Sequence, residues 1–378
     1  MLKTSAFLFL TYASRLSRKD TSLSLGKVEI WPQNIPFVSI VIPCYNHGQY
    51  LDDAVQSVLN QTWQNFEIIV VDDGSNAEET VEILWNFHRP KTRVLHLLKN
   101  MGLPAARNAG IREAQGKYIC CLDADDMLRP TYLEKAIATM EVNAGLSFVG
   151  AWTQVFGDES RVWYSLQFDP HQIIYYNQFG PPAVFKRSAW EQVGGFFEKM
   201  RDGFEDWEFW VRLTANGYRG YRISEKIFLY RRIGYSFALR AAEKREFLFE
   251  KIKENNPAIY TNPKEAIEKI VTSYRDIYST EPFVNLNDRR NYLQMDGVPQ
   301  LIISNLNSEA TIKSLEHQAF RSPMIWVAKY ALDEQATDLL YQNTPFVYIL
   351  PNFLPWYAQY EFIQNLIKVW NIQWVKKI

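Results

Sequence analysis

The sequence carries almost no surplus of charge of either sign. It contains 41 lysines and arginines against 42 aspartates and glutamates, a net charge of −1 over 378 residues. Chains that bind nucleic acid usually carry a clear basic surplus. The overall charge therefore gives no indication of a nucleic-acid partner, and none is expected.

Cysteine is scarce as well. The three cysteines are Cys44, Cys120 and Cys121, and each lies in or beside an expected buried strand. Neighbouring residues of a strand point to opposite faces of the sheet, so a disulfide between Cys120 and Cys121 is not expected. Free thiols fit a reducing compartment, which favours a cytoplasmic protein.

Long apolar runs are also missing. The N-terminal stretch 1–12 is apolar with a single lysine, and it is too short to span a bilayer. No clear small-residue cleavage site follows it. Residues 1–35 are therefore expected to form an N-terminal tail, with a peripheral membrane contact as the alternative.

Several sequence motifs of well-understood chemistry are absent. No Gly-x-Gly-x-x-Gly follows a strand, which argues against a dehydrogenase. Residues 43–49 contain one glycine and no lysine or arginine, whereas a sugar nucleotidyltransferase would need a glycine-rich basic loop there. No convincing Ser/His or Cys/His arrangement indicates a covalent nucleophile.

What the sequence does contain is an alternation of strand and helix patterns. Apolar runs at 38–42, 67–71, 93–97 and 117–122 predict buried strands. Helical spacing of apolar residues predicts helices between and after them, at 50–59, from a cap at Ser75 to Trp85, at 105–114 and after Pro130. This order predicts an α/β fold with a mainly parallel, Rossmann-like nucleotide-binding sheet covered by helices on both faces.

The pattern changes twice further along the chain. The next segment is mixed: strands are expected at 148–155, 183–186 and 223–230, and a helix at 207–213. In a nucleotide-binding α/β protein, such a segment commonly lines the binding site of the second substrate. Helices are expected at 236–254 and 263–279, and strands at 301–304, 324–327 and 346–350. The expected domains are 36–235, a helical segment 236–295, and a small or incomplete α/β region 296–378. A C-terminal extension packed on the first domain is the alternative for the last region.

Three carboxylates follow the strand at 117–122. Asp123 and Asp125 lie two positions apart, so their side chains leave an extended chain on the same side, and Asp126 follows at once. Such a cluster is costly in a partly buried site unless a cation is present. Mn²⁺ or Mg²⁺ prefers oxygen ligands and binds diphosphates jointly with carboxylates. A solvated acidic turn is the alternative.

Two earlier strands also end in polar groups. Pro43 turns the chain out of the first strand and exposes Tyr45 and Asn46, and a tyrosine there can lie flat against a pyrimidine. Asp72 and Asp73 end the second strand and can accept from a base N–H or from ribose hydroxyls. The alternatives are a core tyrosine and ordinary turn chemistry.

Two further segments carry charges. Arg107 lies in the segment 100–110, which is rich in small residues. It could bind a phosphate or pair with the acidic cluster, and a purely structural ion pair is the alternative. Glu205 and Asp206 open a helix between the aromatic residues Phe204 and Trp207. A carboxylate in that environment could act as a general base, or it could simply favour the helix dipole.

With these residues assembled, the first ~235 residues resemble the family 2 glycosyltransferases, inverting enzymes of the GT-A fold. Five motifs carry the resemblance in order: 42–46 (Ile-Pro-Cys-Tyr-Asn), 71–75 (Val-Asp-Asp-Gly-Ser), 100–108, 123–126 (Asp-Ala-Asp-Asp), and 194–206.

The resemblance implies a role for each motif. Asp206 is implied as the catalytic base, with Glu205 beside it, and Asp125 as the metal ligand of an Asp-x-Asp motif. Asp123 is implied near the ribose or the metal. The implied donor-binding set is Pro43, Tyr45, Asn46, Asp73, Arg107 and Asp123.

The expected activity is inverting, metal-dependent transfer of a sugar from a nucleoside diphosphate sugar, with UDP the favoured nucleotide. The Gln-x-x-Arg-Trp motif of processive members is not seen, which favours single additions. The family expectation for the acceptor is a glycan or lipid-linked hydroxyl in surface polysaccharide or glycoconjugate synthesis, at the inner membrane face. A non-catalytic nucleotide-sugar or glycan-binding module is the alternative. The tail from about 298 resembles the start of a second, fused glycosyltransferase domain.

Overall fold

The computed structural model describes residues 23–25, 36–277, 299–316, 324–372 and 374–378. The apolar stretch 1–12, where a membrane contact was an alternative, lies outside the described residues. Within the described ranges, every helix is too short or too polar to cross a membrane.

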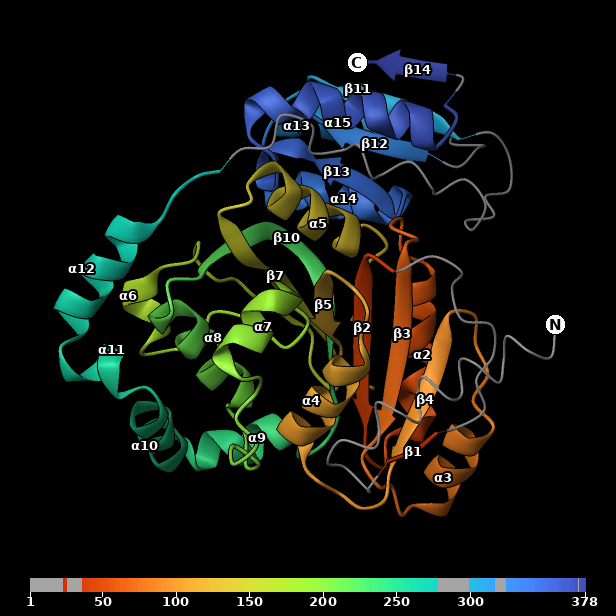
Figure 1. The fold of residues 1–378 in the computed structure, drawn as a ribbon. Coiled ribbons are helices and arrows are strands. Elements are labelled where there is room, and N and C mark those ends of the chain that lie inside the picture. The colour runs from red at the N-terminus through yellow and green to blue at the C-terminus, as the bar shows by residue number, and fades with distance from the viewer. Residues whose placement is uncertain (1–22, 26–35, 278–298, 317–323, 373) are drawn as a thin grey trace, which may run out of the picture.

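The first of two sheets has ten strands, and its core is parallel as predicted (Figure 1). Adjacent parallel strands are β4 (Thr92–Leu97), β3 (Phe66–Asp72), β2 (Val38–Cys44) and β5 (Tyr118–Cys121). The short strand β1 (Leu23–Leu25) adds antiparallel to β4. Every residue of β2, β3, β4 and β5 is buried, as expected for strands covered on both faces.

The other half of this sheet is mixed. Beyond β5 lie β9 (Val184–Lys186), β7 (Leu146–Gly157), β10 (Arg219–Arg232) and β6 (Met127–Leu128), while β8 (Arg161–Trp163) pairs with β7. β10 runs parallel to β7, with register shifts between Ile223 and Phe228. Such irregularities increase local twist and bend the strand. The sheet therefore curls, and the predicted α/β class with a mainly parallel core is confirmed.

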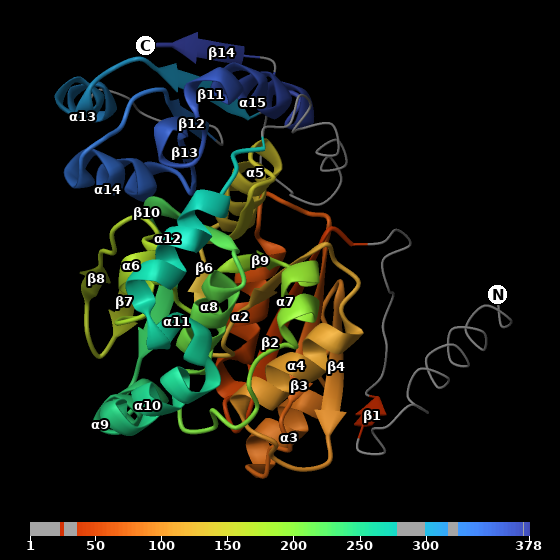
Figure 2. The ribbon, with the colours of Figure 1, turned by 60° about the vertical axis from the view of Figure 1, so that its left-hand side comes forward.

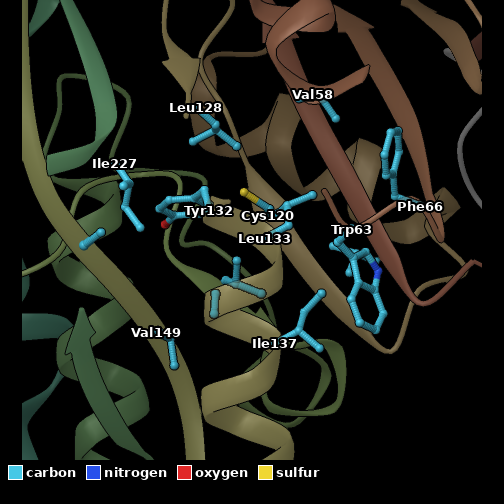
Figure 3. Close-up of a cluster of buried hydrophobic side chains, with 14 of the residues drawn as sticks. Val58, Trp63, Phe66, Cys120, Leu128, Tyr132, Leu133, Ile137, Val149 and Ile227 are labelled. Carbon is cyan, nitrogen blue, oxygen red and sulfur yellow. The ribbon is translucent and has the colours of Figure 1, made fainter. Parts of the chain in front are cut away.

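Helices cover both faces of the parallel strands (Figures 1 and 2). The helices that follow these strands are α2 (Gly48–Leu59), α3 (Glu78–Trp85), α4 (Leu103–Glu113) and α5 (Tyr132–Val142). On one face, Val58 of α2 and Leu133 and Ile137 of α5 join a core that includes Trp63 and Phe66 (Figure 3). On the opposite face, α4 packs so close that a Cβ on Gly110 would lie 2.4 Å from Val41 Cγ1. The small residues of α4 therefore serve helix–sheet packing.

Further helices cover the face that carries α4. They are α6 (Pro170–Ile173), α7 (Arg187–Val193), α8 (Glu205–Ala215), α9 (Phe237–Glu243), α10 (Arg245–Asn255), α11 (Pro257–Thr261) and α12 (Pro263–Ser273). The single helix expected at 236–254 is two helices, because the chain breaks at Lys244. The helix expected at 263–279 ends at Ser273, and positions 278–279 lie outside the described residues.

The predicted cap of α3 is wrong in one detail. The helix begins at Glu78 rather than directly after Ser75, and its N-cap Ala77 makes no side-chain cap. Asn46 from the β2 end instead holds the two residues just before the helix, because its Oδ1 accepts from the N–H groups of Asn76 and Ala77, both at 3.0 Å. Ser75 Oγ in turn accepts from the Asn46 N–H at 3.1 Å. A contact between two loops thus replaces the local one.

The second sheet has four parallel strands in the order β13-β12-β11-β14. Its elements are β11 (Gln300–Ser304), α13 (Ser308–Glu316), β12 (Met324–Ala328), α14 (Glu334–Asn343), β13 (Phe346–Ile349), the 3₁₀ turn η2 (Leu350–Asn352), α15 (Trp356–Val369) and β14 (Trp374–Lys377). The domain boundaries at 36, 236 and 296 remain predictions.

The second sheet lies above α5 and β10 (Figure 2, top), and buried polar groups join it to the first sheet. Lys135 of α5 and Glu225 of β10 pair at 2.7 Å, and both are fully buried. Tyr341 of α14 donates its hydroxyl to the same Glu225 oxygen at 2.7 Å, and Tyr348 of β13 donates to Glu134 of α5 at 2.7 Å. Tyr341 and Tyr348 thus donate across the junction to buried carboxylates of β10 and α5.

This junction generates a stability prediction. Tyr341→Phe removes a buried donor to Glu225, so we expect the free energy of unfolding to fall by about 1–2 kcal/mol. Denaturant unfolding measures it. The matched control is Tyr330→Phe at an exposed tyrosine, which should change the free energy by less than about 0.5 kcal/mol. Equal effects of the two substitutions would show that the junction does not form as described.

Candidate active site

The carboxyl ends of β2, β3 and β5 lie side by side, because Cys44 pairs with Asp72 and Val41 pairs with Cys121 in parallel register. The polar groups that follow these strands therefore share one edge of the sheet, as the sequence predicted. Pro43 is the penultimate residue of β2. Tyr45 follows the strand with 41% of its surface exposed, and Asn46 adopts a left-handed φ of 57°. The exposed Tyr45 ring is available to a ligand at this edge.

Asp73 is held inside the protein at this edge. Its Oδ1 accepts from the Met101 N–H at 2.7 Å and its Oδ2 from the Gly102 N–H at 2.9 Å. The side chain is almost fully buried, and burial raises its pKa above the ordinary value. Asp73 therefore fixes the loop that leads into α4. A contact with a base, implied by the resemblance, stays a prediction.

A fully buried arginine connects three motifs. Arg107 of α4 donates from Nη2 to Asp123 Oδ1 at 2.7 Å and from Nη1 to Glu205 Oε1 at 2.6 Å. Burial alone would lower the pKa of Arg107, but the two carboxylates hold it above its ordinary value. Of the readings left open for Arg107, the geometry shows the ion pair with the acidic cluster. A contact between Arg107 and a phosphate stays a prediction.

Asn108, next to Arg107, ties the same helix to the Gly-Gly-Phe turn. Its Oδ1 accepts from the Phe196 N–H at 2.8 Å, and its Nδ2 donates to the Phe196 carbonyl at 2.8 Å. The motifs 100–108 and 194–206, far apart in sequence, are thus fastened together by two successive residues of α4.

The three acids of residues 123–126 point to different partners. Asp123 meets Arg107, whereas Asp126 is fully buried and accepts from the Arg231 N–H at 2.8 Å. Asp125 Oδ2 lies 3.6 Å from His47 Nδ1. Burial raises the pKa of Asp125, and the neighbouring Asp123 raises it further. The sequence treated these acids as one cluster, while the fold gives each its own environment.

Arg231, at the end of β10, was not singled out from the sequence. Its Nε donates to the Asp125 carbonyl at 2.8 Å, and its Nη2 donates to Asp53 Oδ2 at 2.8 Å. Together with its N–H bond to Asp126, it clamps the acidic turn between β10 and α2. The only sequence signal was an arginine pair at the end of a predicted strand. His47, in the loop between β2 and α2, is the side chain that faces Asp125.

The donor set suits a small divalent cation that is bound partly by its substrate. No three His, Cys, Asp or Glu side chains converge on a metal position within the described ranges. Asp125 and the Asp123 oxygen that Arg107 does not contact are the two carboxylate ligands on offer. Mg²⁺-type ions commonly take one or two carboxylates and complete their shell with phosphate oxygens and water. The residues therefore fit such an ion.

The two acids that open α8 differ sharply. Glu205 is buried and bonded to Arg107, and burial raises its pKa to about 7. Asp206 is half-buried, and its Oδ1 accepts from the Trp207 N–H at 2.7 Å while Oδ2 accepts from Asn177 Nδ2 at 2.9 Å. Burial also raises the pKa of Asp206. Glu205 is thus committed to an ion pair, while Asp206 is held by neutral donors.

Comparisons with known proteins define the class. Residues 39–207 match the model described as glycosyl transferase family 2. The chain is 28% identical over 212 residues to an uncharacterized glycosyltransferase of Methanocaldococcus jannaschii, covering 52% of this chain and 71% of the relative. It is 29% identical over 227 residues to the putative teichuronic acid biosynthesis glycosyltransferase TuaG of Bacillus subtilis, covering 58% of this chain and 89% of TuaG.

Solved structures agree on the fold. A structure of S. aureus TarS in complex with UDP-GlcNAc matches with a TM-score of 0.51 and 17% identity, over 62% of this chain and 71% of that one. The fold is the GT-A architecture, and the family model and the named relatives show that the protein is a glycosyltransferase. More narrowly, the chain contains a domain, residues 39–207, that matches family 2 of these enzymes.

The central ion pair generates a second prediction. Arg107→Ala leaves two carboxylates in a buried position without their cation, so we expect a loss of about 3–5 kcal/mol in the free energy of unfolding. Arg112→Ala on the same helix is the control, because Arg112 is exposed and lies 3.8 Å from Glu198; it should cost less than about 1 kcal/mol. Urea unfolding compares them. If both variants lost the same amount, Arg107 would not be the buried bridge.

Proposed function

We propose that this glycosyltransferase moves a single sugar from a UDP-linked donor to an acceptor hydroxyl with inversion, in surface polysaccharide or glycoconjugate synthesis. The observation that carries the proposal is the Arg107 bridge, which fastens the acidic turn 123–126 to the helix that begins with Glu205 and Asp206. A donor-side acid and an acceptor-side acid are thereby held at one edge of the sheet.

Donor recognition is assigned to the ends of β2 and β3. The exposed Tyr45 ring can stack on a planar base. Pro43 and Asn46 shape the loop that presents this ring, and Asp73 and Asp123 supply carboxylate oxygens near the base and the ribose. S. aureus TarS, which shares the fold, is recorded in complex with UDP-GlcNAc, so UDP is the nucleotide to test first.

The metal site is assigned to Asp125 and Asp123. Mn²⁺ or Mg²⁺ bound there would offset the negative charge that develops on the departing diphosphate. The raised pKa of Asp125 supports this assignment, because a nearby cation would relieve the cost of its buried negative charge.

The proton transfer is assigned to Asp206. Its carboxylate removes the proton of the acceptor hydroxyl as that oxygen bonds to the anomeric carbon. The bond from that carbon to the diphosphate oxygen breaks on the opposite face, and one displacement inverts the configuration. Glu205 is unsuited to act as the base, because Arg107 occupies its carboxylate, and we assign it to holding Arg107 in place.

The acceptor is proposed to be a glycan or lipid-linked hydroxyl. The Bacillus subtilis relative TuaG is described as a putative teichuronic acid biosynthesis glycosyltransferase. This description supports an acceptor in polysaccharide synthesis. A panel of UDP-, GDP- and dTDP-sugars, scored by nucleotide release with Mn²⁺, tests the donor. Faster release from a GDP- or dTDP-sugar than from any UDP-sugar would refute the nucleotide assignment.

The base assignment predicts that Asp206→Asn retains UDP binding but loses about 10²–10⁴-fold in turnover, the usual reach of general base catalysis. UDP release from the preferred UDP-sugar and calorimetric UDP binding measure the two effects. The control is Asp202→Asn, an exposed aspartate paired with Lys244, which should keep near-normal turnover. Asp206 would be removed from the role if its variant turned over normally.

The metal assignment predicts that Asp125→Ala abolishes the dependence of UDP affinity on Mn²⁺. Calorimetry with and without the ion measures this directly. Asp52→Ala is the control, because Asp52 is an exposed residue of α2 that pairs with Arg89. The Asp52→Ala variant should bind UDP and respond to Mn²⁺ as the wild type does. An Asp125→Ala variant whose UDP affinity still rises with Mn²⁺ would falsify the assignment.

A further inference from the structure

Among the residues that the structure describes, one side chain from outside α8 donates to the Asp206 carboxylate, and it lies in a segment not counted among the motifs. Asn177 follows the short helix α6 and precedes β9. Its Nδ2 donates to Asp206 Oδ2 at 2.9 Å. The amide orientation is fixed, because Asn177 Oδ1 accepts from the Phe179 N–H at 3.2 Å. The nitrogen therefore has to face the carboxylate.

Three side chains tether the backbone just before Asn177. The last carbonyls of a helix have no partner within it. Here, the Ile173 carbonyl accepts from Trp207 Nε1 at 2.6 Å. The next two carbonyls accept from the 236–277 helices, Ile174 from the Tyr260 hydroxyl at 2.7 Å and Tyr175 from Arg245 Nη2 at 3.1 Å. Helices α8, α10 and α11 thus converge on this stretch.

Through these hydrogen bonds, the helices after β10 fix the backbone that leads to Asn177. Trp207 is the residue next to Asp206, and Arg245 also lies 5.3 Å over the Trp207 ring. The same side chain that packs beside the acid therefore fixes the carbonyl four positions before Asn177. Asn177 lies in an exposed connection between α6 and β9, yet the backbone before it is fixed by side chains from three helices. Such support is expected where the position of a side chain matters for function.

We propose that Asn177 is the positioning residue of this enzyme's base, holding Oδ2 of Asp206 so that the carboxylate keeps one orientation toward the acceptor hydroxyl. The proposal rests on the function assigned to Asp206 above. The Trp207 N–H holds the other oxygen, so the two donors together fix the plane of the carboxylate. A carboxylate left with one donor would rotate, and fewer encounters would have reactive geometry.

The charges that face Asp206 come from three elements. Arg107 of α4 favours its ionised form, whereas Asp123 after β5 and Glu205 on α8 disfavour it. Asn177 adds a donor to the ionised form. Because donors to a carboxylate lower its pKa, loss of Asn177 should move the acid limb of the pH–rate profile to higher pH. That limb belongs to Asp206 and Glu205 jointly, since the two interact.

Asn177→Asp is the most informative substitution. The new carboxylate still accepts from the Phe179 N–H, so the loop keeps its hydrogen bond, but the donor to Asp206 becomes a second negative charge. We expect kcat for UDP release from the preferred UDP-sugar to fall about 10–100-fold at pH 7, the usual cost of losing an orienting partner. KM for the donor should stay unchanged, and the acid limb should move to higher pH. Asn177→Ala should show the same direction with a smaller shift.

The controls separate this proposal from the function on which it rests. Gln172→Ala, in the same segment, should behave as wild type. A carbon-13 titration of the Asp206 carboxylate, assigned by its absence in Asp206→Asn, reports on the hydrogen bond without any substrate. We expect its pKa to rise in Asn177→Ala.

Three outcomes bear on the two claims. If Asp206→Asn abolishes turnover while both Asn177 variants keep wild-type kcat and the Asp206 titration does not move, the positioning proposal fails and the proposed function stands. If Asp206→Asn keeps its turnover, the base assignment itself fails. Loss of activity with loss of thermal stability in Asn177→Asp would mark Asn177 as purely structural and also overturn the proposal.

Discussion

The site depends on one buried cation. Arg107 lies fully inside the protein with Asp123 on one side and Glu205 on the other. An arginine can bridge two carboxylates because its planar guanidinium offers donors in a fixed fork. Without it, two acids from opposite halves of the domain would repel each other in a medium that screens poorly. With it, the strand-end turn and helix α8 are held together, and Asp125 and Asp206, which the bridge does not engage, remain for the roles proposed for them.

The rest of the domain stabilises this unit from outside. Strand β10 carries Arg231 at one end, where it clamps the acidic turn, and Glu225 and Lys226 further back, where they meet the second sheet. Helix α5, which follows the acidic turn, contributes Lys135 to the same junction. The second sheet therefore packs on the two elements that leave the site. Buried ion pairs of this kind add little net stability, but breaking one is costly, so they hold one arrangement in preference to others.

The sequence predicted the four central strands, their parallel arrangement and the edge where the polar groups meet, because each depends on local signals: apolar runs, helical spacing and turn residues. It missed the short strands β1, β6, β8 and β14. It could not assign partners. Asp73, Asp123 and Asp126 look alike in sequence, yet one binds backbone N–H groups, one binds Arg107 and one is buried against β10. Those partners lie tens of residues away, and the same is true of Asn177, Asn108 and Arg231. The cap expected from Ser75 was wrong for that reason, since Ser75 Oγ accepts from the N–H of Asn46 in another loop.

The most direct test is a crystal structure with UDP and Mn²⁺, with the ion located by its anomalous scattering. We expect one manganese peak bonded to Asp125 and to diphosphate oxygens, Arg107 still bridging Asp123 and Glu205, and the Asp206 carboxylate facing the position of the donor sugar. A nucleotide bound elsewhere, or an Arg107 side chain that leaves both carboxylates to contact the diphosphate, would contradict the central role of the buried bridge.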